Sequence, residues 1–365
     1  MKVLILANSD KGLYNFRKEL IDAMLEKEYE IYISVPRGER IEELKALGCK
    51  HIETEIDRRG TNPIKDLALI TKYNKIIKEV KPDVVLTYTI KPNIYGGISC
   101  RINKVPYIVN VTGLGTALEN EGFLQKVLIF MYRIALKKVT CCFAQNQENL
   151  EFLKSNIKST DKYKLLPGSG VNLDKYKLLD YPKENEKMKF LFMSRIMKEK
   201  GIEQYIETAK TIKAKYPNTE FHILGACEEQ YEETLKELQK NNIVFYHGLQ
   251  KDVVPYLKQS VCLIHPSYYP EGMSNVLLEA SASGRPVITT NRSGCREIVE
   301  DGKTGYIVPI KDSQATIKAV EIFINLTYKA KVEMGKAARN KVEKEFDRNI
   351  VITNYLNQIE SIKRS

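Results

Sequence analysis

Two short segments in the second half of the chain carry charged side chains suited to a phosphorylated ligand. In FLFMSRIMKEKG, Arg195 directly follows an apolar run and Lys200 comes just before Gly201. Arginine offers a planar fork of donors to a phosphate, and lysine offers a point charge. At the end of a strand, the two cations would meet a diphosphate. A basic loop on a basic protein is the alternative reading of this segment alone.

The second segment is HPSYYPEGMSNVLLEASASG, in which an apolar run ends at His265 and a helix is expected to begin near Ser274. Glu271 precedes this helix and Glu279 lies within it, so the two carboxylates can address opposite ends of one extended ligand. We expect Ser274 to cap the helix and four unpaired backbone amides to form an anion site at its positive end. These amides belong to Gly272, Met273, Ser274 and Asn275. The alternative is an ordinary capping loop with a surface glutamate on each side.

The elements that must position these residues alternate between short β-branched runs and amphipathic segments. In the first half, the runs at 3–7, 31–35, 84–88, 107–111 and 140–145 predict strands, with a last short strand at 165–167. In the second half, the predicted strands are 190–194, 221–224, 243–246, 261–265, 286–290 and 305–308. Helical segments lie between them. Near-continuous apolar strands predict parallel sheets covered on both faces, hence two doubly wound α/β domains.

The rhythm breaks once, in a polar stretch without periodicity. We therefore predict a first domain over 1–170, a linker over 171–187, a second domain over 188–346 and a C-terminal helix over 347–365. In doubly wound sheets, ligands bind beyond the carboxyl ends of the strands. The loops that carry Arg195 and Glu271 follow predicted strands, so both are placed where a ligand is expected.

Composition narrows the class of protein. The chain has 365 residues, 28% of them charged, a formal net charge of +11 and seven scattered cysteines. This length favours two domains, and the cysteines fit a reducing cytosol better than a disulfide framework. We expect no signal peptide and no membrane-spanning segment. The positive charge alone suggests nucleic acid or anionic lipid as partners, but no motif for nucleic-acid recognition supports the former.

Taken together, the two charged segments resemble the retaining glycosyltransferases of family 4, which have the GT-B fold. The resemblance rests on SRIMKEKG, on the Glu-x7-Glu pair in EGMSNVLLEA and on SGRPVITTNRSGCREIVEDGKTGYIV, and it covers nearly the whole chain. In the first half, NSDKGLYNFR, TYTIKPNIYGG and NVTGLG are similar to a branch that extends lipid-linked intermediates of bacterial capsules, O-antigens and glycoprotein glycans.

The resemblance implies two Rossmann-like domains that face a central cleft, with the donor bound by the second domain. Arg195 and Lys200 would hold the donor diphosphate, and Glu279 would accept hydrogen bonds from the ribose. Glu271 would bind hydroxyls of the donor sugar, beside the amides of Gly272 to Asn275. The last helix would return to the first domain, where truncating it should loosen domain closure. No metal or other cofactor is implied, and Asp-x-Asp is absent from the sequence.

The first domain would bind the acceptor through loops that follow its strands. The candidates are Gly12, Tyr14 and Arg17 after the first strand, Lys91 and Asn93 after the strand at 84–88, and Thr112 to Gly115 after the strand at 107–111, with Thr112 and Gly113 foremost. Lys91 could meet an acceptor diphosphate. Turn geometry that requires glycine is the alternative for these loops. Many family members have a histidine here, but this domain has only His51, which leaves the acceptor-side catalytic group unassigned.

A basic apolar helix at 122–138 suggests contact with a membrane. Its apolar face could enter the lipid boundary while Lys126, Arg133, Lys137 and Lys138 meet anionic headgroups. The alternative is a core helix with a basic rim, and periodicity does not separate the two.

The resemblance implies transfer of an N-acetylhexosamine such as N-acetylgalactosamine from a UDP-sugar to an undecaprenyl-diphosphate-linked saccharide, at the cytoplasmic face of the membrane. A soluble acceptor or a non-catalytic nucleotide-sugar-binding protein are the alternatives.

Overall fold

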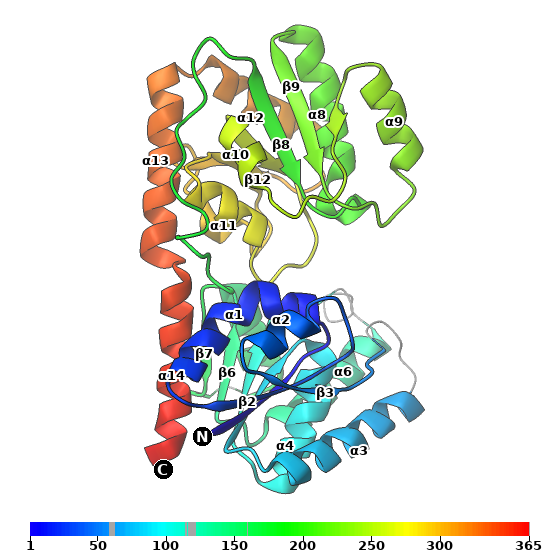
Figure 1. The fold of residues 1–365 in the computed structure, drawn as a ribbon. Helices are drawn as coiled ribbons and strands as arrows, with labels where there is room; N and C mark the ends of the chain where they lie inside the picture. The colour runs from blue at the N-terminus through cyan, green and yellow to red at the C-terminus, as the bar shows by residue number, and fades with distance from the viewer. Residues whose placement is uncertain (58–62, 114, 116–121, 159, 365) are drawn as a thin grey trace. The chain divides into compact units, whose positions relative to one another are not determined.

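The structure is a computed structural model that describes residues 1–57, 63–113, 115, 122–158 and 160–364 (Figure 1). By its internal contacts the chain divides into two compact units. The first unit combines Met1–Ser169 with Asn349–Ser365, and the second unit is Gly170–Arg348. Each unit has its own parallel sheet with a hydrophobic core on either face.

The described part of the first unit forms a seven-stranded sheet of parallel neighbours in the order β3-β2-β1-β4-β5-β6-β7. The strands are β1 (Lys2–Leu6), β2 (Glu30–Val35), β3 (Lys50–Glu53), β4 (Val84–Tyr88), β5 (Tyr107–Val111), β6 (Cys141–Ala144) and β7 (Tyr163–Leu165). Since the chain changes winding direction between β1 and β4, this pair is the switch point at which doubly wound sheets bind ligands.

Helices cover both faces of this sheet because side chains alternate along its strands. In β1, Val3 and Ile5 pack toward α1 (Asp10–Glu26), α2 (Ile41–Ala46) and α14 (Arg348–Arg364). Leu4 and Leu6 pack into the opposite core. The elements over that core are α3 (Pro63–Val80), the π-helical turn η1 (Pro92–Gly96), α4 (Gly97–Asn103), α6 (Phe123–Leu136) and α7 (Gln147–Asn156). The alternation thus buries both faces of a central strand.

The second unit repeats this plan with a six-stranded parallel sheet in the order β10-β9-β8-β11-β12-β13. Its strands are β8 (Met188–Met193), β9 (Thr219–Leu224), β10 (Phe245–Tyr246), β11 (Cys262–His265), β12 (Val287–Thr290) and β13 (Gly305–Val308). Its helices are α8 (Ile202–Lys215), α9 (Glu232–Lys240), α10 (Val254–Gln259), α11 (Asn275–Ala282), α12 (Ser313–Asn325) and α13 (Tyr328–Glu345), with short 3-10 turns η2 (Lys198–Lys200) and η3 (Arg296–Ile298). Here the switch point lies between β8 and β11.

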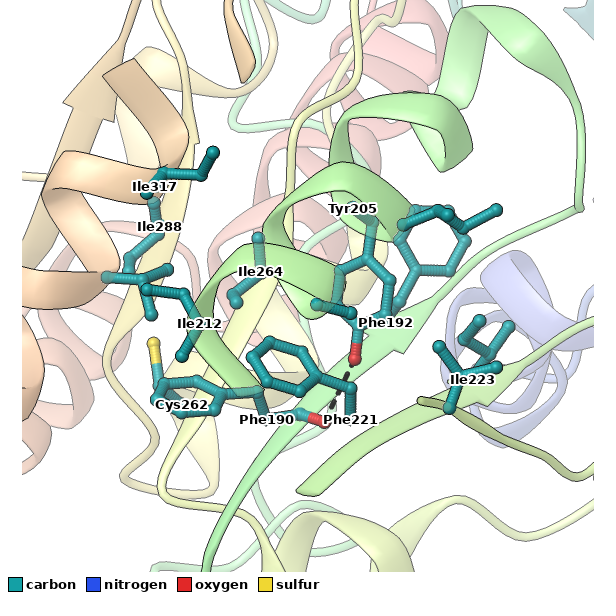
Figure 2. Close-up of a cluster of buried hydrophobic side chains, with 14 of the residues drawn as sticks. Phe190, Phe192, Tyr205, Ile212, Phe221, Ile223, Cys262, Ile264, Ile288 and Ile317 are labelled. Carbon is teal, nitrogen blue, oxygen red and sulfur yellow. Dashed lines mark hydrogen bonds between the residues drawn. The ribbon is translucent and has the colours of Figure 1, made fainter. Parts of the chain in front are cut away.

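One core of the second unit lies between this sheet and helices α8, α9 and α12 (Figure 2). Phe190 and Phe221 stack with their ring centroids 5.2 Å apart. The buried Tyr205 places its hydroxyl on two carbonyls, those of Phe190 at 3.0 Å and His222 at 2.9 Å. A buried tyrosine is costly unless its hydroxyl is bonded, so these bonds fix α8 over β8 and β9. The loop between β8 and α8 is thereby held in place.

The two sheets confirm the prediction of two doubly wound α/β domains, with two local differences. Residues 171–187, expected as a linker, belong to the second unit, because Val171 and Tyr176 are buried in its core. The edge strand β3 was missed because its sequence, KHIE, has exposed charges at both ends.

Candidate functional site

Arg195 and Lys200 lie on the loop that follows β8, and neighbouring side chains hold both. The Nη1 of Arg195 donates to Glu228 Oε2 at 2.8 Å. Lys200 is buried, with 7% of its side chain exposed, and forms an ion pair with Glu271. Both cations also approach the ring of Tyr269, Arg195 Cζ at 5.3 Å and Lys200 Nζ at 4.7 Å from its centroid. The structure therefore brings together the three residues predicted to be catalytic: Arg195, Lys200 and Glu271.

These residues meet because β8 and β11 are neighbours in the sheet and their following loops pack together. The amide of Tyr268 donates to the carbonyl of Glu199 at 2.9 Å. Gly201 has a φ of +80°, and a Cβ there would lie 2.2 Å from the carbonyl oxygen of Pro266. Only glycine fits this backbone conformation and this close approach. The glycine of KEKG is thus required by the contact between the two loops.

The start of α11 differs from the sequence-based expectation. Ser274 is the N-cap residue, but its side chain makes no capping hydrogen bond. Its Oγ lies 3.4 Å from Nε2 of the buried His265. Its amide donates to the carbonyl of Gly294 at 2.8 Å, so the expectations of a capping side chain and of an unpaired amide at Ser274 were wrong. Met273 is buried in the hydrophobic core beside α11. The roles of Gly272, Met273, Ser274 and Asn275 toward a donor stay predictions.

A third loop, which the sequence analysis did not single out as a site, supports the loop that carries Glu271. It follows β12, the next strand of the sheet. The carboxylate of Glu297 accepts from the amide of Gly294 at 2.7 Å and from Ser293 Oγ at 3.0 Å. Gly294 has a φ of +86°, and a Cβ there would lie 2.9 Å from the carbonyl oxygen of Gly272. The signal in the sequence was a Ser-Gly pair after a strand with a glutamate three residues beyond the glycine.

Glu279 lies within α11, eight residues after Glu271. Burial raises the pKa of its carboxyl group to about 7, although hydrogen bonding from Tyr176 and the charges of Lys175 and Arg348 act in the opposite direction. Burial disfavours the charged form, so a proton is held until near-neutral pH. A carboxyl group poised in this way fits a ligand-binding role better than a surface glutamate.

In the first unit, the predicted residues after β1 are divided between surface and interior. Gly12 belongs to the first turn of α1, where its amide donates to Ser9 Oγ at 3.2 Å. Tyr14 is half-buried, and the guanidinium of Arg40 lies 5.0 Å from the centroid of its ring. Arg17 is buried and lies 4.7 Å above the ring of Tyr88. Arg17 is therefore packed into the interior of this unit, while Gly12 and Tyr14 are partly accessible.

The predicted residues after β4 and β5 also differ in their burial and in their partners. Lys91 forms an ion pair with Asp66 at 2.7 Å, and each side chain is 15% exposed. Asn93 is buried and ties β4 to β5, because it accepts from Thr87 Oγ1 at 2.8 Å and donates to the carbonyl of Asn110 at 2.9 Å. Thr112 and Gly113 are half-buried. Of the other two residues of that group, Gly115 is half-buried and Leu114 lies outside the described residues.

The described residues contain neither a metal-ligand cluster nor a membrane-spanning helix. No group of three or more histidine, cysteine, aspartate or glutamate side chains is arranged to hold a metal ion there. Within the same part of the chain, no helix combines the length and the apolar character that crossing a bilayer requires.

Comparison with known proteins identifies the class. Residues 179–341 match the family model of glycosyl transferases group 1, and residues 2–146 match the glycosyl transferase 4-like model. A crystal structure of a glycosyltransferase from Rickettsia africae superposes with a TM-score of 0.84 at 20% identity, over 100% of this chain and 99% of that one. The chain thus belongs to the glycosyltransferases of the GT-B fold, as the sequence predicted.

Two curated relatives are similar over most of their length. An N,N'-diacetylbacillosaminyl-diphospho-undecaprenol alpha-1,3-N-acetylgalactosaminyltransferase of Campylobacter jejuni is 24% identical, over 98% of this chain and 97% of the relative. A UDP-Gal:alpha-D-GlcNAc-diphosphoundecaprenol alpha-1,3-galactosyltransferase of Escherichia coli is 26% identical, over 79% of this chain and 78% of the relative.

Proposed function

We propose that this glycosyltransferase moves an N-acetylhexosamine such as N-acetylgalactosamine, with retention, from a UDP-sugar to an undecaprenyl-diphosphate-linked saccharide. Its place would be bacterial surface polysaccharide or glycan assembly, at the cytoplasmic face of the membrane. The observation that carries the proposal is the cluster of Arg195, Lys200 and Glu271 at the switch point of the second sheet. Ligands of doubly wound sheets bind at such an edge.

The cluster suits a nucleoside diphosphate leaving group. As the bond between the sugar C1 and the phosphate oxygen breaks, negative charge develops on the β-phosphate. Arg195 and Lys200 are already held in place by Glu228, Glu271 and Tyr269, so little reorganisation is needed when that charge appears. The acceptor oxygen then bonds to C1 on the same face, and its proton passes to the departing phosphate oxygen.

The ion pair between Lys200 and Glu271 suggests how donor and protein fit together. A diphosphate that reaches Lys200 competes with the carboxylate of Glu271 for the same ammonium group. Released from the lysine, Glu271 can accept hydroxyls of the donor sugar. The amides of Gly272 to Asn275, other than that of Ser274, would lie beside the phosphate, and Glu279 would bind the ribose.

The identity of the acceptor is supported by the relatives and by charge. Both curated relatives named above act on sugars joined to undecaprenol through a diphosphate, and both make α-1,3 linkages. UDP-hexoses carry the sugar in α-linkage, so an α product from such a donor means retention. The exposed basic residues of α6 would place the first unit against anionic lipid.

The test is a transfer assay that supplies UDP-sugars and undecaprenyl-diphosphate-linked saccharides in detergent micelles. We expect transfer of one N-acetylhexosamine with an α-linked product. Lys200→Ala and Arg195→Ala should each lower turnover by about 10²- to 10³-fold, because each removes a charge that stabilises the leaving group. Lys198→Ala is the matched control, since Lys198 lies on the same loop with 62% of its side chain exposed.

Three results would contradict the proposal: transfer only to a soluble saccharide, binding of UDP-sugars without any transfer, or equal losses in Lys198→Ala and Lys200→Ala. A thermal-shift screen of nucleotide sugars tests the role of Glu271 separately. A donor that stabilises the wild type should lose much of this effect in Glu271→Ala.

A further inference from the structure

The turn after β4 takes part in a polar cluster of Asp66, Lys91 and Tyr95, and neither Asp66 nor Tyr95 has been given a role so far. Asp66, in the first turn of α3, accepts hydrogen bonds on both carboxylate oxygens. Lys91 Nζ donates to Oδ1 at 2.7 Å, and the hydroxyl of Tyr95 donates to Oδ2 at 2.7 Å. The three residues come from α3, the turn after β4, and η1. They gather at the carboxyl end of β4, one of the two strands that form the switch point of this sheet.

The backbone of this turn is strained. Thr89 follows β4 with a φ of +73°, a conformation that is unusual for a β-branched residue. Its Oγ1 is buried and, among the described residues, has no hydrogen-bond partner. The next five-residue segment, Pro92–Gly96, is a π-helical turn rather than an α-helix. Strained residues and π-turns cost free energy and concentrate at functional sites. These features are independent of the ion pair and occur at the same place.

The charge balance of the cluster indicates what it can bind. A diphosphate at Lys91 would also approach the carboxylate of Asp66, which repels it. An ionised carboxylate accepts at about four lone-pair positions, and Lys91 and Tyr95 occupy two of them. Lys91 has further N–H donors. Both charged side chains are 15% exposed. A neutral pair with spare donors and acceptors matches the hydroxyl groups of a sugar better than it matches a phosphate.

We propose that Asp66, held in place by Lys91 and Tyr95, binds hydroxyl groups of the acceptor sugar. The turn at Thr89–Lys91 is then the acceptor-sugar subsite of the first unit. This inference rests on the proposed function and deepens it, because it assigns a recognition residue on the acceptor side. It also gives Lys91 a different role from contact with the acceptor diphosphate.

The experiment compares two lipids in detergent micelles: undecaprenyl diphosphate that carries one N-acetylhexosamine, and bare undecaprenyl diphosphate. Binding of each is measured at equilibrium, and transfer is measured with the first. Asp66→Asn should weaken binding of the sugar-bearing lipid about 10- to 100-fold and raise the acceptor KM in parallel, since a hydrogen bond to a charged group is lost. The donor KM and the affinity for bare undecaprenyl diphosphate should stay at wild-type values. Tyr95→Phe, which keeps the ion pair, should cause a smaller loss in the same direction.

Asp22→Asn is the matched control, because Asp22 also pairs with a lysine of the first unit, Lys18, at 2.9 Å on α1. Thermal unfolding shows whether each variant is folded. The proposal is overturned by unchanged binding of the sugar-bearing lipid in Asp66→Asn and Tyr95→Phe, or by an equal loss for the two lipids, which would mean that the cluster recognises the diphosphate. It is also overturned if the wild type binds neither lipid. If the wild type binds the sugar-bearing lipid through Asp66 but transfers nothing to it, the proposed function fails while this inference stands.

Discussion

Tyr269 is the residue that links the two cations of the proposed donor site. Arg195 and Lys200 each have a carboxylate partner on a different loop, but both lie within 5.3 Å of the centroid of the same ring. A cation over an aromatic face gains about 0.5–2 kcal/mol. The aromatic ring thus holds two like charges near each other before any diphosphate is present. Sequence reasoning passed over it because a tyrosine in a loop rich in tyrosine and proline carries no distinctive signal.

Replacing this ring should weaken the donor site in proportion to the lost contacts. We expect Tyr269→Leu to lower kcat/KM for the donor about 3- to 30-fold. Tyr269→Phe should cause a smaller loss, because it keeps the ring but removes the hydroxyl that bonds to Arg195. The adjacent Tyr268 is the control, since its ring contacts Lys311 at 4.9 Å instead. Steady-state kinetics with varied donor measure the effect. A loss in Tyr268→Leu as large as that in Tyr269→Leu would argue against the cation contacts.

If Glu279 binds the donor ribose as proposed, its raised pKa should make donor binding depend on pH. Burial holds this pKa at about 7, and the ionised carboxylate is the stronger acceptor for ribose hydroxyls. The affinity for a UDP-sugar should therefore rise as pH increases from 6 to 8, by at most about tenfold per pH unit below 7. Glu279→Gln should remove this dependence. Two histidines of the second unit, His222 and His265, do not titrate in this window, since desolvation lowers the pKa of His222 to about 4 and that of His265 to about 3. Titration calorimetry across this range is the measurement.

The free energy of unfolding should also depend on the ionisation of Glu279, but it should fall as pH rises, whereas donor affinity should increase. The folded state holds the proton of Glu279 up to about pH 7, whereas an unfolded chain releases it near 4.5. The free energy of unfolding therefore falls as pH rises from about 4.5 to 7 and changes no further above that. Glu279→Gln should accordingly gain stability relative to the wild type between pH 5 and pH 8. Urea unfolding at both values tests this, and an equal difference at the two pH values would contradict the raised pKa.

At the scale of secondary structure, the sequence predicted the elements that are marked by a periodic pattern of apolar residues. The central strands of both units and the loops that carry Arg195 and Glu271 follow from buried runs and the residues after them. What it missed depends on contacts that are distant in sequence. The strain at Thr89, the pairing of Asp66 with Lys91 and the support of Gly294 by Glu297 have no periodic signature, because each is set by neighbouring strands that pack in space. The alternatives for α6 stayed open for the same reason.

In the structure, α6 has one buried face and one exposed face. One face is buried through Tyr132, Ala135 and Leu136. The other is exposed at alternating intervals of three and four residues, so its side chains form one stripe along the helix. The stripe consists of Phe123, Lys126, Phe130, Arg133 and Lys137. Phe123 is 84% exposed and Phe130 is 60% exposed, and no acidic residue occurs within the helix. Exposed aromatic and basic residues on one stripe are typical of helices that bind anionic lipid surfaces.

This stripe predicts the membrane binding of the protein. Phe123→Ser with Phe130→Ser should lower binding to vesicles that contain anionic lipid at least about tenfold, because two aromatic side chains no longer enter the lipid boundary. Raising the salt concentration should weaken wild-type binding as well. Leu249→Ser is the control, since Leu249 is 74% exposed and lies in the second unit. Vesicle flotation measures both effects, and equal binding of the double variant and the wild type would exclude α6 as the contact.

At the scale of the whole molecule, the chain returns to its first unit only in its last helix. In α14, Val351, Tyr355 and Ile359 are buried in the core of that unit. The hydroxyl of Tyr355 accepts from Asn110 Nδ2 at 2.6 Å, and its ring lies 4.9 Å from that of Phe143. The side-chain oxygen of Asn110 also accepts from Gln145 Nε2, and its backbone carbonyl accepts from Asn93 Nδ2. The helix therefore completes a buried polar network at the ends of β4, β5 and β6.

The segment that enters the second unit and the segment that leaves it pair with each other. The amide of Val171 donates to the carbonyl of Phe346 at 2.9 Å, and that of Arg348 donates to the carbonyl of Val171 at 3.1 Å. Gly170 has a φ of +64°, and a Cβ there would lie 2.5 Å from Cα of Arg348. The two crossings are thus joined to each other, and glycine is needed for that approach.

This arrangement predicts that the first unit cannot fold stably from its first 169 residues. Burying the three apolar side chains of α14 stabilises the unit by about 1.5–3 kcal/mol each, a sum comparable to the whole stability of a typical domain. Residues 1–169 alone should therefore lack a cooperative urea transition, and fusing residues 349–365 to them through a flexible linker should restore one. Residues 170–348, which contain none of these three side chains, are the control and should unfold cooperatively by themselves. A cooperative transition of the same midpoint in 1–169 with and without the helix would show that α14 only covers a core that is already complete.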